Sequence, residues 1–194
     1  MKHIFLSVLV LVACNTKPSA PATSGETQSG GADLPEGASI VPFGDESGLS
    51  MVVARDASGH ITWQGFLADN ERVGTWTEYH SNGMVKTTVA YVDGKKEGQF
   101  VELSNSGQLV RQCTYHNNMR HGEYKEYNFS TIKEERYYQN GNLEGVVKIY
   151  YPDGKIMEEG LYHDGARNGV SKWYDQQGNV SITYEYKNGQ LVKN

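Results

Sequence analysis

Two pairs of adjacent glutamates, Glu134-Glu135 and Glu158-Glu159, have the composition that general acid–base chemistry needs, in which one carboxyl group donates a proton and another accepts one. Each pair lies in a segment whose pattern predicts a β-strand, and adjacent side chains of a strand point to opposite faces. The two carboxylates of a pair therefore do not converge on one reacting group. We interpret both pairs as solvated strand surface.

A second pattern with catalytic potential is Ser130-Thr131-Ile132-Lys133, which matches the Ser-x-x-Lys of penicillin-binding enzymes. In those enzymes the serine nucleophile begins a helix, whereas here the segment falls in an expected hairpin turn without a Lys-Thr-Gly partner. We interpret the match as coincidental. The sequence predicts no catalytic residues and no enzymatic activity.

Histidines could bind a metal only if the fold brought them together. Beyond the N-terminal region they are His60, His80, His116, His121 and His163. Only His116 and His163 occupy equivalent positions of the repeat described below. Two units of two strands, at about 4.8 Å per strand, would separate them by roughly 19 Å, too far to share one ion. We expect no metal site, and glycines spread one per turn predict no phosphate loop and no cofactor.

Residues 1–13 have the organisation of a secretory signal, because Lys2 precedes a short apolar run that begins at Ile4. The run is about ten residues long, half of what a bilayer span requires. Its end, Leu11-Val12-Ala13-Cys14, resembles the lipobox of bacterial lipoproteins. The resemblance implies that Cys14 becomes the first mature residue and carries the lipid anchor. An ordinary signal peptide, in which Cys14 is incidental, is the alternative.

The residue after the lipobox indicates which of the two bacterial membranes holds the protein. Asn15 follows Cys14, where an aspartate would suggest retention in the inner membrane. We therefore expect a protein of the bacterial cell envelope, held in the outer membrane by the lipid on Cys14. Cys113 is then the remaining thiol, so no intramolecular disulfide can form, and we expect it to be a small buried hydrophobe.

Residues 14–37 are rich in Ser, Thr, Pro, Ala and Gly, without an aromatic residue. Such a segment cannot bury enough apolar surface to offset its ordering entropy, so we expect a disordered, lipid-anchored linker. Residues 38–49 then form an N-terminal cap or lead-in strand. The formal net charge of −5 excludes the basic surface that nucleic-acid binding requires.

The rest of the chain, residues 50–194, repeats with a period of about 24 residues. The repeat is marked by glycines at 24-residue steps, with one 23-residue step, at Gly74, Gly98, Gly122, Gly145 and Gly169. Six units fill the region. A second glycine and an Asn/Asp-Gly pair punctuate most units, as in Asn82-Gly83 and Asp93-Gly94, which predicts β-hairpins.

Alternation along the strands predicts which side chains share a face. In the second strand of each unit, an apolar residue and a tyrosine, such as Val85 and Tyr91, are six residues apart, so we expect both on one face. In the first strand Trp76 and Tyr79 are three apart. This odd spacing predicts a bulge or a sharp twist there.

The repeat of glycine, aromatic residue and Asn/Asp-Gly turn resembles the MORN-repeat family, most of all the variant MORN repeats of bacterial proteins, some of which are labelled antitoxins. The resemblance covers residues 50–194. It implies an all-β fold, an elongated single-layer antiparallel β-meander of about six hairpin repeats whose aromatic side chains line one face. It also implies scaffolding or partner binding without chemistry.

We expect the aromatic residues to form the core of the sheet, because a single layer must cover one face with large side chains, and they are also the candidate binding surface. The candidates are Trp76, Tyr79, Tyr91, Tyr115, Tyr138, Tyr162 and Tyr186. We expect a membrane-anchored module that binds a protein or glycan partner through this face and does not bind nucleic acid. The alternatives are an antitoxin-like or immunity-like protein that neutralises a toxin, and an envelope enzyme or accessory protein acting on peptidoglycan or another glycan.

Overall fold

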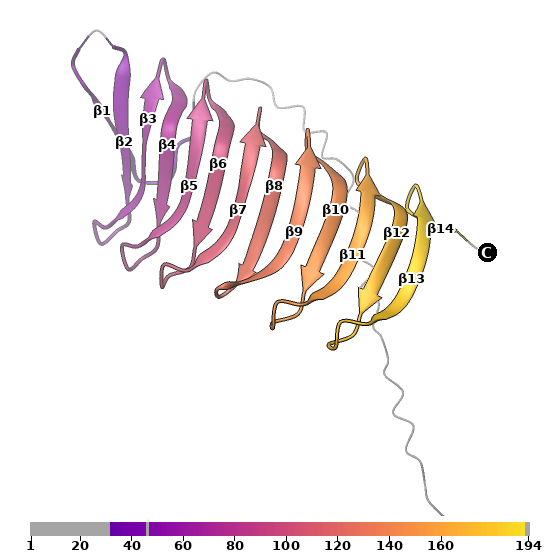
Figure 1. Cartoon of the computed structure of the whole chain (residues 1–194). Helices are drawn as coiled ribbons and strands as arrows, with labels where there is room; N and C mark the ends of the chain where they lie inside the picture. Colours follow the sequence, from indigo (N-terminus) through magenta and orange to yellow (C-terminus); the bar gives the residue numbers. More distant parts are fainter. Residues whose placement is uncertain (1–31, 46, 193–194) are drawn as a thin grey trace, which may run out of the picture. The chain divides into compact units, whose positions relative to one another are not determined.

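A computed structural model describes residues 32–45 and 47–192, which form one open antiparallel sheet of 14 strands in sequential order (Figure 1). The expected all-β meander is confirmed. Residues 1–13, the expected signal peptide, and most of the expected linker lie outside the described residues. The strands are β1 (Ala38–Pro42), β2 (Leu49–Arg55), β3 (Ile61–Ala68), β4 (Glu71–Tyr79), β5 (Val85–Val92), β6 (Lys95–Leu103), β7 (Leu109–His116), β8 (Met119–Asn128), β9 (Thr131–Gln139), β10 (Asn142–Tyr150), β11 (Ile156–His163), β12 (Ala166–Tyr174), β13 (Val180–Lys187) and β14 (Gln190–Leu191).

Two kinds of turn join the strands, and the sequence accounts for both. Between β9 and β10, Asn140 and Gly141 have φ values of 49° and 85°, the backbone of a two-residue type I′ turn. The turns at the other end of the hairpins are longer and use one glycine at positive φ, such as Gly83 at 81°. The expected hairpin turns are therefore present.

The glycine that marks the repeat creates a bend in the first strand of each unit. Gln64 pairs with Thr77 and Phe66 pairs with Val73, so three residues of β4 oppose one residue of β3. Gly74 lies in this segment at a φ of 63°, a conformation that side chains with a Cβ rarely adopt. The same register shift recurs between β5 and β6, β7 and β8, β9 and β10, and β11 and β12.

The bulge expected in the first strand between Trp76 and Tyr79 is not found there, because the extra residue lies on the neighbouring strand, β5. Glu78 pairs with Thr87 and Tyr79 pairs with Val85, so Lys86 is the extra residue. The bulge breaks the alternation of β5, and Val85 lies on the face opposite Tyr91. The expectation that the apolar residue and the tyrosine share a face is therefore wrong, because it assumed an unbroken strand.

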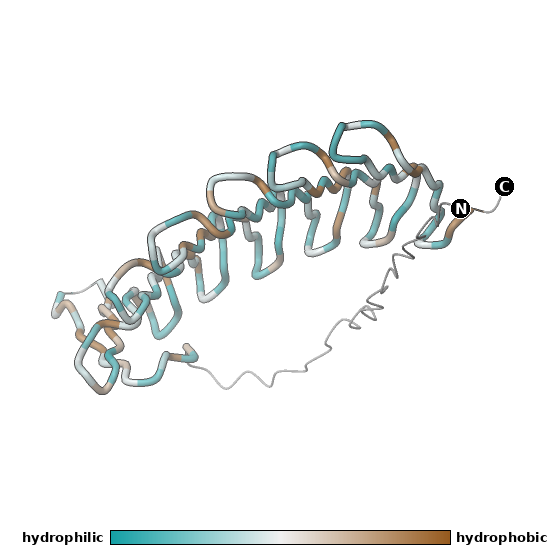
Figure 2. Tube along the Cα trace, turned by 90° about the horizontal axis from the view of Figure 1, so that it is seen from below, coloured by the Kyte–Doolittle hydropathy of each residue, from teal (hydrophilic) through white to brown (hydrophobic). Residues whose placement is uncertain are grey.

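We call the side of the sheet that carries Trp76 and Tyr91 the aromatic face, and the other side the opposite face. The core lies on the aromatic face, in one cluster of Val52, Leu67, Trp76, Val89 and Tyr91 and a second cluster of Cys113, Tyr124 and Tyr138. Figure 2 shows hydrophobic residues gathered along the length of the sheet, with more hydrophilic turns on both sides.

The end of the expected linker is ordered. The backbone N–H of Ala32 donates to the carbonyl oxygen of Asn70 at 3.1 Å, and Leu34 packs against the first core cluster. The few apolar side chains of this segment find a hydrophobic surface to cover, which the composition of the segment does not indicate. β1 follows and pairs with β2 from Ala38 to Pro42.

Candidate functional site

The candidate aromatic residues divide into three groups. Trp76, Tyr91 and Tyr138 are buried at 0%, 7% and 7% exposure, so they serve as core. Tyr79 lies on the opposite face, since it is three residues from Trp76 in a strand without an extra residue between them. The third group lies on the aromatic face and is partly exposed, and it consists of Tyr115, Tyr162 and Tyr186.

A basic side chain stacks on these rings in most units, two residues before the repeat glycine. The guanidinium of Arg72 lies 4.4 Å from the Trp76 ring and 5.4 Å from the Tyr91 ring. Lys96 Nζ lies 5.3 Å from the Tyr115 ring, and the guanidinium of Arg167 lies 5.2 Å from the Tyr162 ring. A cation above an aromatic face is attracted by the ring quadrupole. Sequence reasoning missed these residues, although their fixed spacing from the glycine was visible.

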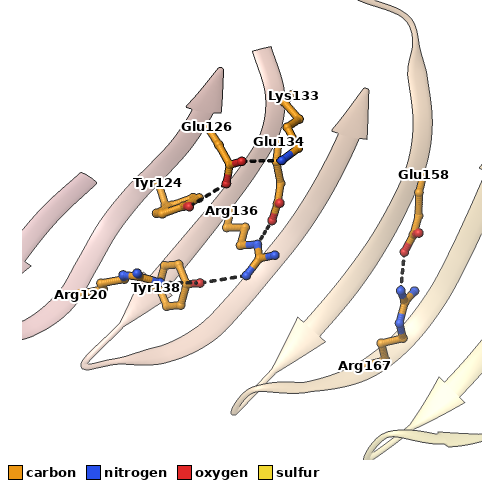
Figure 3. A network of polar contacts seen from close by, with 9 residues as sticks. All are labelled: Arg120, Tyr124, Glu126, Lys133, Glu134, Arg136, Tyr138, Glu158 and Arg167. Carbon is orange, nitrogen blue, oxygen red and sulfur yellow. Dashed lines mark hydrogen bonds and ion pairs between the residues drawn. The ribbon is translucent and has the colours of Figure 1, made fainter. Parts of the chain in front are cut away.

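The aromatic face also carries charged and hydroxyl groups. Glu78 accepts hydrogen bonds from Lys86 and Thr87 in β4 and β5, and Figure 3 shows the network of such groups that lies from β8 onward. Glu126 accepts hydrogen bonds from Lys133 Nζ at 2.5 Å and from the Tyr124 hydroxyl at 3.1 Å. The bond from Lys133, more than that from Tyr124, lowers the pKa of Glu126, whereas burial acts in the other direction. Burial raises the pKa of Tyr124, and the bond to Glu126 raises it further.

The same network holds an ion pair whose carboxylate is buried. Glu134 is 8% exposed and pairs with the Arg136 guanidinium. Arg136 Nη1 also donates to the Tyr138 hydroxyl at 3.2 Å. Glu134 was expected to be solvated, and that expectation is wrong because Arg136 supplies the opposite charge that a buried carboxylate requires.

Farther along, Glu158 is the acceptor of a matching group. It pairs with Arg167, and Trp173 Nε1 donates to its carboxylate at 3.0 Å. Glu158 is therefore also half-buried, not solvated. The neighbouring Glu159 receives the Tyr174 hydroxyl at 2.5 Å on the opposite face. The expected divergence of adjacent glutamates is thus confirmed, and neither pair forms a two-carboxylate site.

The opposite face carries alternating charges across β8–β12. The register aligns Lys125, Glu135, Lys148, Glu159 and Lys172 in one line perpendicular to the strands. Glu135 also accepts from the hydroxyl of Tyr150 at 2.5 Å. Burial, and then this bond, raise the pKa of Tyr150 well above its usual value.

Exposed apolar side chains lie beside these charges. Tyr137, Val146, Leu161 and Val170 are 44%, 49%, 42% and 48% exposed. Val146 pairs directly with Leu161, and Leu161 packs against the backbone of Gly169, next to Val170. Sequence reasoning missed this group, because the bends must be known before these residues can be placed on one face.

The histidines hold turns in place. His116 Nδ1 lies 2.8 Å from a carboxylate oxygen of Glu97, and His163 Nδ1 lies 2.9 Å from one of Glu144. The other oxygen of Glu144 accepts the backbone N–H of Asp164 in the turn of the same unit. Among residues 32–45 and 47–192, no group of three or more His, Cys, Asp or Glu side chains is arranged to hold a metal ion.

The other reactive side chains are also engaged structurally. Ser130 lies in the turn before β9, as expected, and Lys133 bonds to Glu126. Cys113 is 5% exposed, and burial raises the pKa of its thiol, which keeps it protonated. Its expected burial is confirmed. Cys14, the expected lipid attachment site, lies outside the described residues. In the part of the chain that the structure covers, no helix has the length and apolar character needed to cross a bilayer.

Comparisons with solved structures give weak similarities. TarM matches with a TM-score of 0.30 and 12% identity over 59% of this chain and 20% of that chain. A mutant of S. aureus TarM in complex with Fondaparinux, alpha-GlcNAc-glycerol and UDP matches with a TM-score of 0.26 and 10% identity over 82% and 22%. The GtfA/B complex bound to UDP and GlcNAc matches with a TM-score of 0.24 and 14% identity over 78% and 24%.

The chain thus spans about a fifth to a quarter of the length of these proteins, and TM-scores of this size support no conclusion about activity. No curated protein sequence matches the chain. The family model described as MORN repeat variant matches residues 72–93, 143–164 and 167–188. These segments correspond to β4–β5, β10–β11 and β12–β13. Three hairpins of the sheet therefore match the MORN repeat variant.

Proposed function

We propose that the protein is a lipid-anchored lipoprotein of the bacterial envelope that binds a partner through its repeat sheet without chemistry. The lipobox-like segment ending at Cys14 supports the anchor, and Asn15 favours the outer membrane. The MORN repeats support a binding module, since repeat sheets offer long surfaces for partners.

The observation that carries the binding role is the row of partly exposed tyrosines, each in contact with a cation. Tyr115 with Lys96, and Tyr162 and Tyr186 with Arg167, present a ring and a positive charge side by side. Rings of this kind stack on the apolar faces of sugars or on peptide side chains, and the cations and hydroxyls form hydrogen bonds. A protein or a glycan chain lying along the face would meet such a pair repeatedly.

The anchor is tested by Cys14→Ala, which removes the only residue that the lipobox pattern offers for lipidation. We expect the variant to remain unprocessed by the lipoprotein signal peptidase and to carry no acyl chains in mass spectrometry. Normal processing of Cys14→Ala, with normal membrane fractionation, would contradict the lipoprotein assignment.

The binding face is tested by crosslinking and mass spectrometry on cells expressing the tagged protein, followed by pull-down of the partner and of isolated sacculi. Tyr115→Leu, Tyr162→Leu and Tyr186→Leu keep apolar volume and remove the aromatic ring. We expect retention to weaken in steps as they are combined, while Gln99→Ala, an exposed change on the opposite face, has no effect. Unchanged retention by the folded triple variant would refute the role of this face.

A further inference from the structure

Two parallel rows of side chains cross β9–β12 on the opposite face. The apolar row consists of Tyr137, Val146, Leu161 and Val170. The charged row consists of Glu135, Lys148, Glu159 and Lys172. In each strand the charged residue is two positions from the apolar one, always toward the same end of the hairpins. Both rows span the same four strands, so together they form one surface patch.

The apolar row is confined to these strands, and the charged row extends one strand farther, to Lys125 in β8. In β4–β7 the positions equivalent to the apolar row are Thr75, Ala90, Gln99 and Thr114. Those equivalent to the charged row are Thr77, Thr88, Val101 and Gln112. The repeat itself therefore requires neither exposed apolar side chains nor alternating charges at these positions, and the patch calls for an explanation specific to β9–β12.

We propose that a second copy of this chain packs against the patch with the same patch of its own, about a two-fold axis that runs along the strands between β10 and β11. This rotation exchanges β10 with β11 and β9 with β12 while it preserves position along the strands. Val146 then faces the partner's Leu161, and Tyr137 faces the partner's Val170. Apolar side chains meet apolar side chains along the whole row.

The charged row fits the same axis. Lys148 faces the partner's Glu159, and Glu135 faces the partner's Lys172, so each copy contributes two opposite-charge contacts. A two-fold axis along a single strand, such as β10, would bring Lys148 opposite the partner's Lys148. A two-fold axis along the charged row would bring every charged residue opposite the same residue of the partner. The alternation of charge therefore selects an axis between two strands, and a self-associating interface must be self-complementary in this way.

The two rows have different roles in the interface. The apolar row supplies the driving force, because its side chains leave water on association. Exposed ion pairs add little free energy, but like charges placed together oppose association, so the charged row fixes the register. Four strands at about 4.8 Å make the patch about 19 Å wide, and its two rows lie about 7 Å apart, two residues at about 3.3 Å each. The patch therefore covers roughly a few hundred Å², less than the roughly 800 Å² per partner of a standard interface. We expect a weak dimer.

The test uses the full chain in detergent and measures its mass by analytical ultracentrifugation at concentrations from about 1 µM to about 1 mM, the range of weak association. Lys148→Glu and Glu159→Lys are measured separately and then mixed. Each variant alone places like charges across the axis and should dimerise at least about tenfold more weakly, which is about 1.4 kcal/mol. The mixture should dimerise like the wild type, because every cross-axis contact is again between opposite charges.

The mixing step separates contacts between copies from contacts within one chain, since Lys148 and Glu159 are also cross-strand neighbours. Mixing cannot repair a defect inside either chain. A second pair of variants tests the apolar row: Val146→Asp should abolish dimerisation, whereas Gln99→Asp, at the equivalent position of β6, should leave it unchanged. Circular dichroism confirms that each variant is folded.

Three results would overturn the proposal. The wild type could remain a monomer over the whole concentration range, which would mean that the patch does not self-associate. The mixture could dimerise no better than the separate variants, which would exclude the proposed axis. A wild-type dimer that Val146→Asp leaves intact would place the interface elsewhere on the sheet.

Discussion

The first and second halves of the sheet use one backbone plan with opposite distributions of polar and apolar side chains. Trp76 in β4 and Ser171 in β12 both lie two residues after a repeat glycine, and both are 0% exposed. Around Trp76 the aromatic face holds buried apolar side chains, with Arg72 stacked on the ring, whereas around Ser171 it holds Arg167 and Glu158. The opposite face changes the other way, from threonine and glutamine to exposed valine and leucine.

The difference is explained by what covers each region. Ala32 and Leu34 pack against the first core cluster, and this cover removes water from its apolar side chains. The second cluster is packed by Phe100, Tyr115 and Leu143, which belong to the sheet itself. A sheet face in contact with water is better filled by paired charges and stacked cations. The repeat backbone thus depends on its glycines and turns more than on the identity of the core residues.

The largest effect that distinguishes the halves should come from Trp76→Ala. Loss of the buried indole leaves a large cavity, and the carbonyl oxygen of Phe66 loses the Nε1–H that donates to it at 3.1 Å. We expect a loss of about 3–5 kcal/mol in the free energy of unfolding. The matched change Trp173→Ala removes a half-buried ring and should lose about 1–2 kcal/mol, since less area returns to water. Urea denaturation followed by circular dichroism measures both, and equal losses would contradict the contrast.

The ion pair of the second half should be costly to break and inexpensive to replace. Arg136→Leu leaves the carboxylate of Glu134 buried without its partner, so we expect a loss of about 2–4 kcal/mol, less than for a fully buried pair because Arg136 is partly exposed. Glu134→Leu combined with Arg136→Leu should lose less than Arg136→Leu alone. A double variant that is less stable than both single variants would show that the pair adds net stability.

Two matched glycines test how rigid each half is. A Cβ on Gly65 would lie 2.3 Å from the ring of the buried Trp76, whereas a Cβ on Gly160 would lie 2.8 Å from the Ser171 hydroxyl. We expect Gly65→Ala to lose about 1–3 kcal/mol through overpacking and Gly160→Ala to lose less, because small polar side chains can shift. Thermal melting of the two variants gives the comparison, which fails if Gly160→Ala is the more damaging change.

The sequence predicted the features that repeat and missed those that depend on register. The glycine period and the Asn/Asp-Gly turns were sufficient to predict the meander and its hairpins. The shared face of Val85 and Tyr91 was wrong, because one bulged residue reverses the direction of every side chain beyond it. The burial of Glu134 and the patch on β9–β12 were missed for the same reason, since both require the cross-strand partner of each residue.

The smallest expected effect concerns pH and again compares equivalent positions of the two halves. Glu144 and Val73 occupy equivalent positions, each directly before the repeat glycine of its unit. Of these two residues, Glu144 is the one that bonds to a histidine. The hydrogen bond from His163 to Glu144 raises the pKa of His163, and the same contact lowers that of Glu144. A histidine with a raised pKa contributes its stabilisation below its unfolded value of about 6.5, and this is lost as the pH rises through the folded pKa.

NMR titration of the His163 ring should therefore show a midpoint above about 6.5 in the wild type and a lower midpoint in Glu144→Val, where only Asp164 still raises the pKa of His163. The side chains of both residues lie at the surface, so the accompanying change in melting temperature between pH 6 and pH 8.5 should be small. Glu97→Val, which removes the carboxylate facing His116 two units earlier, is the matched control and should leave the His163 midpoint unchanged. If Glu144→Val leaves that midpoint in place, the carboxylate is not the cause of the shift.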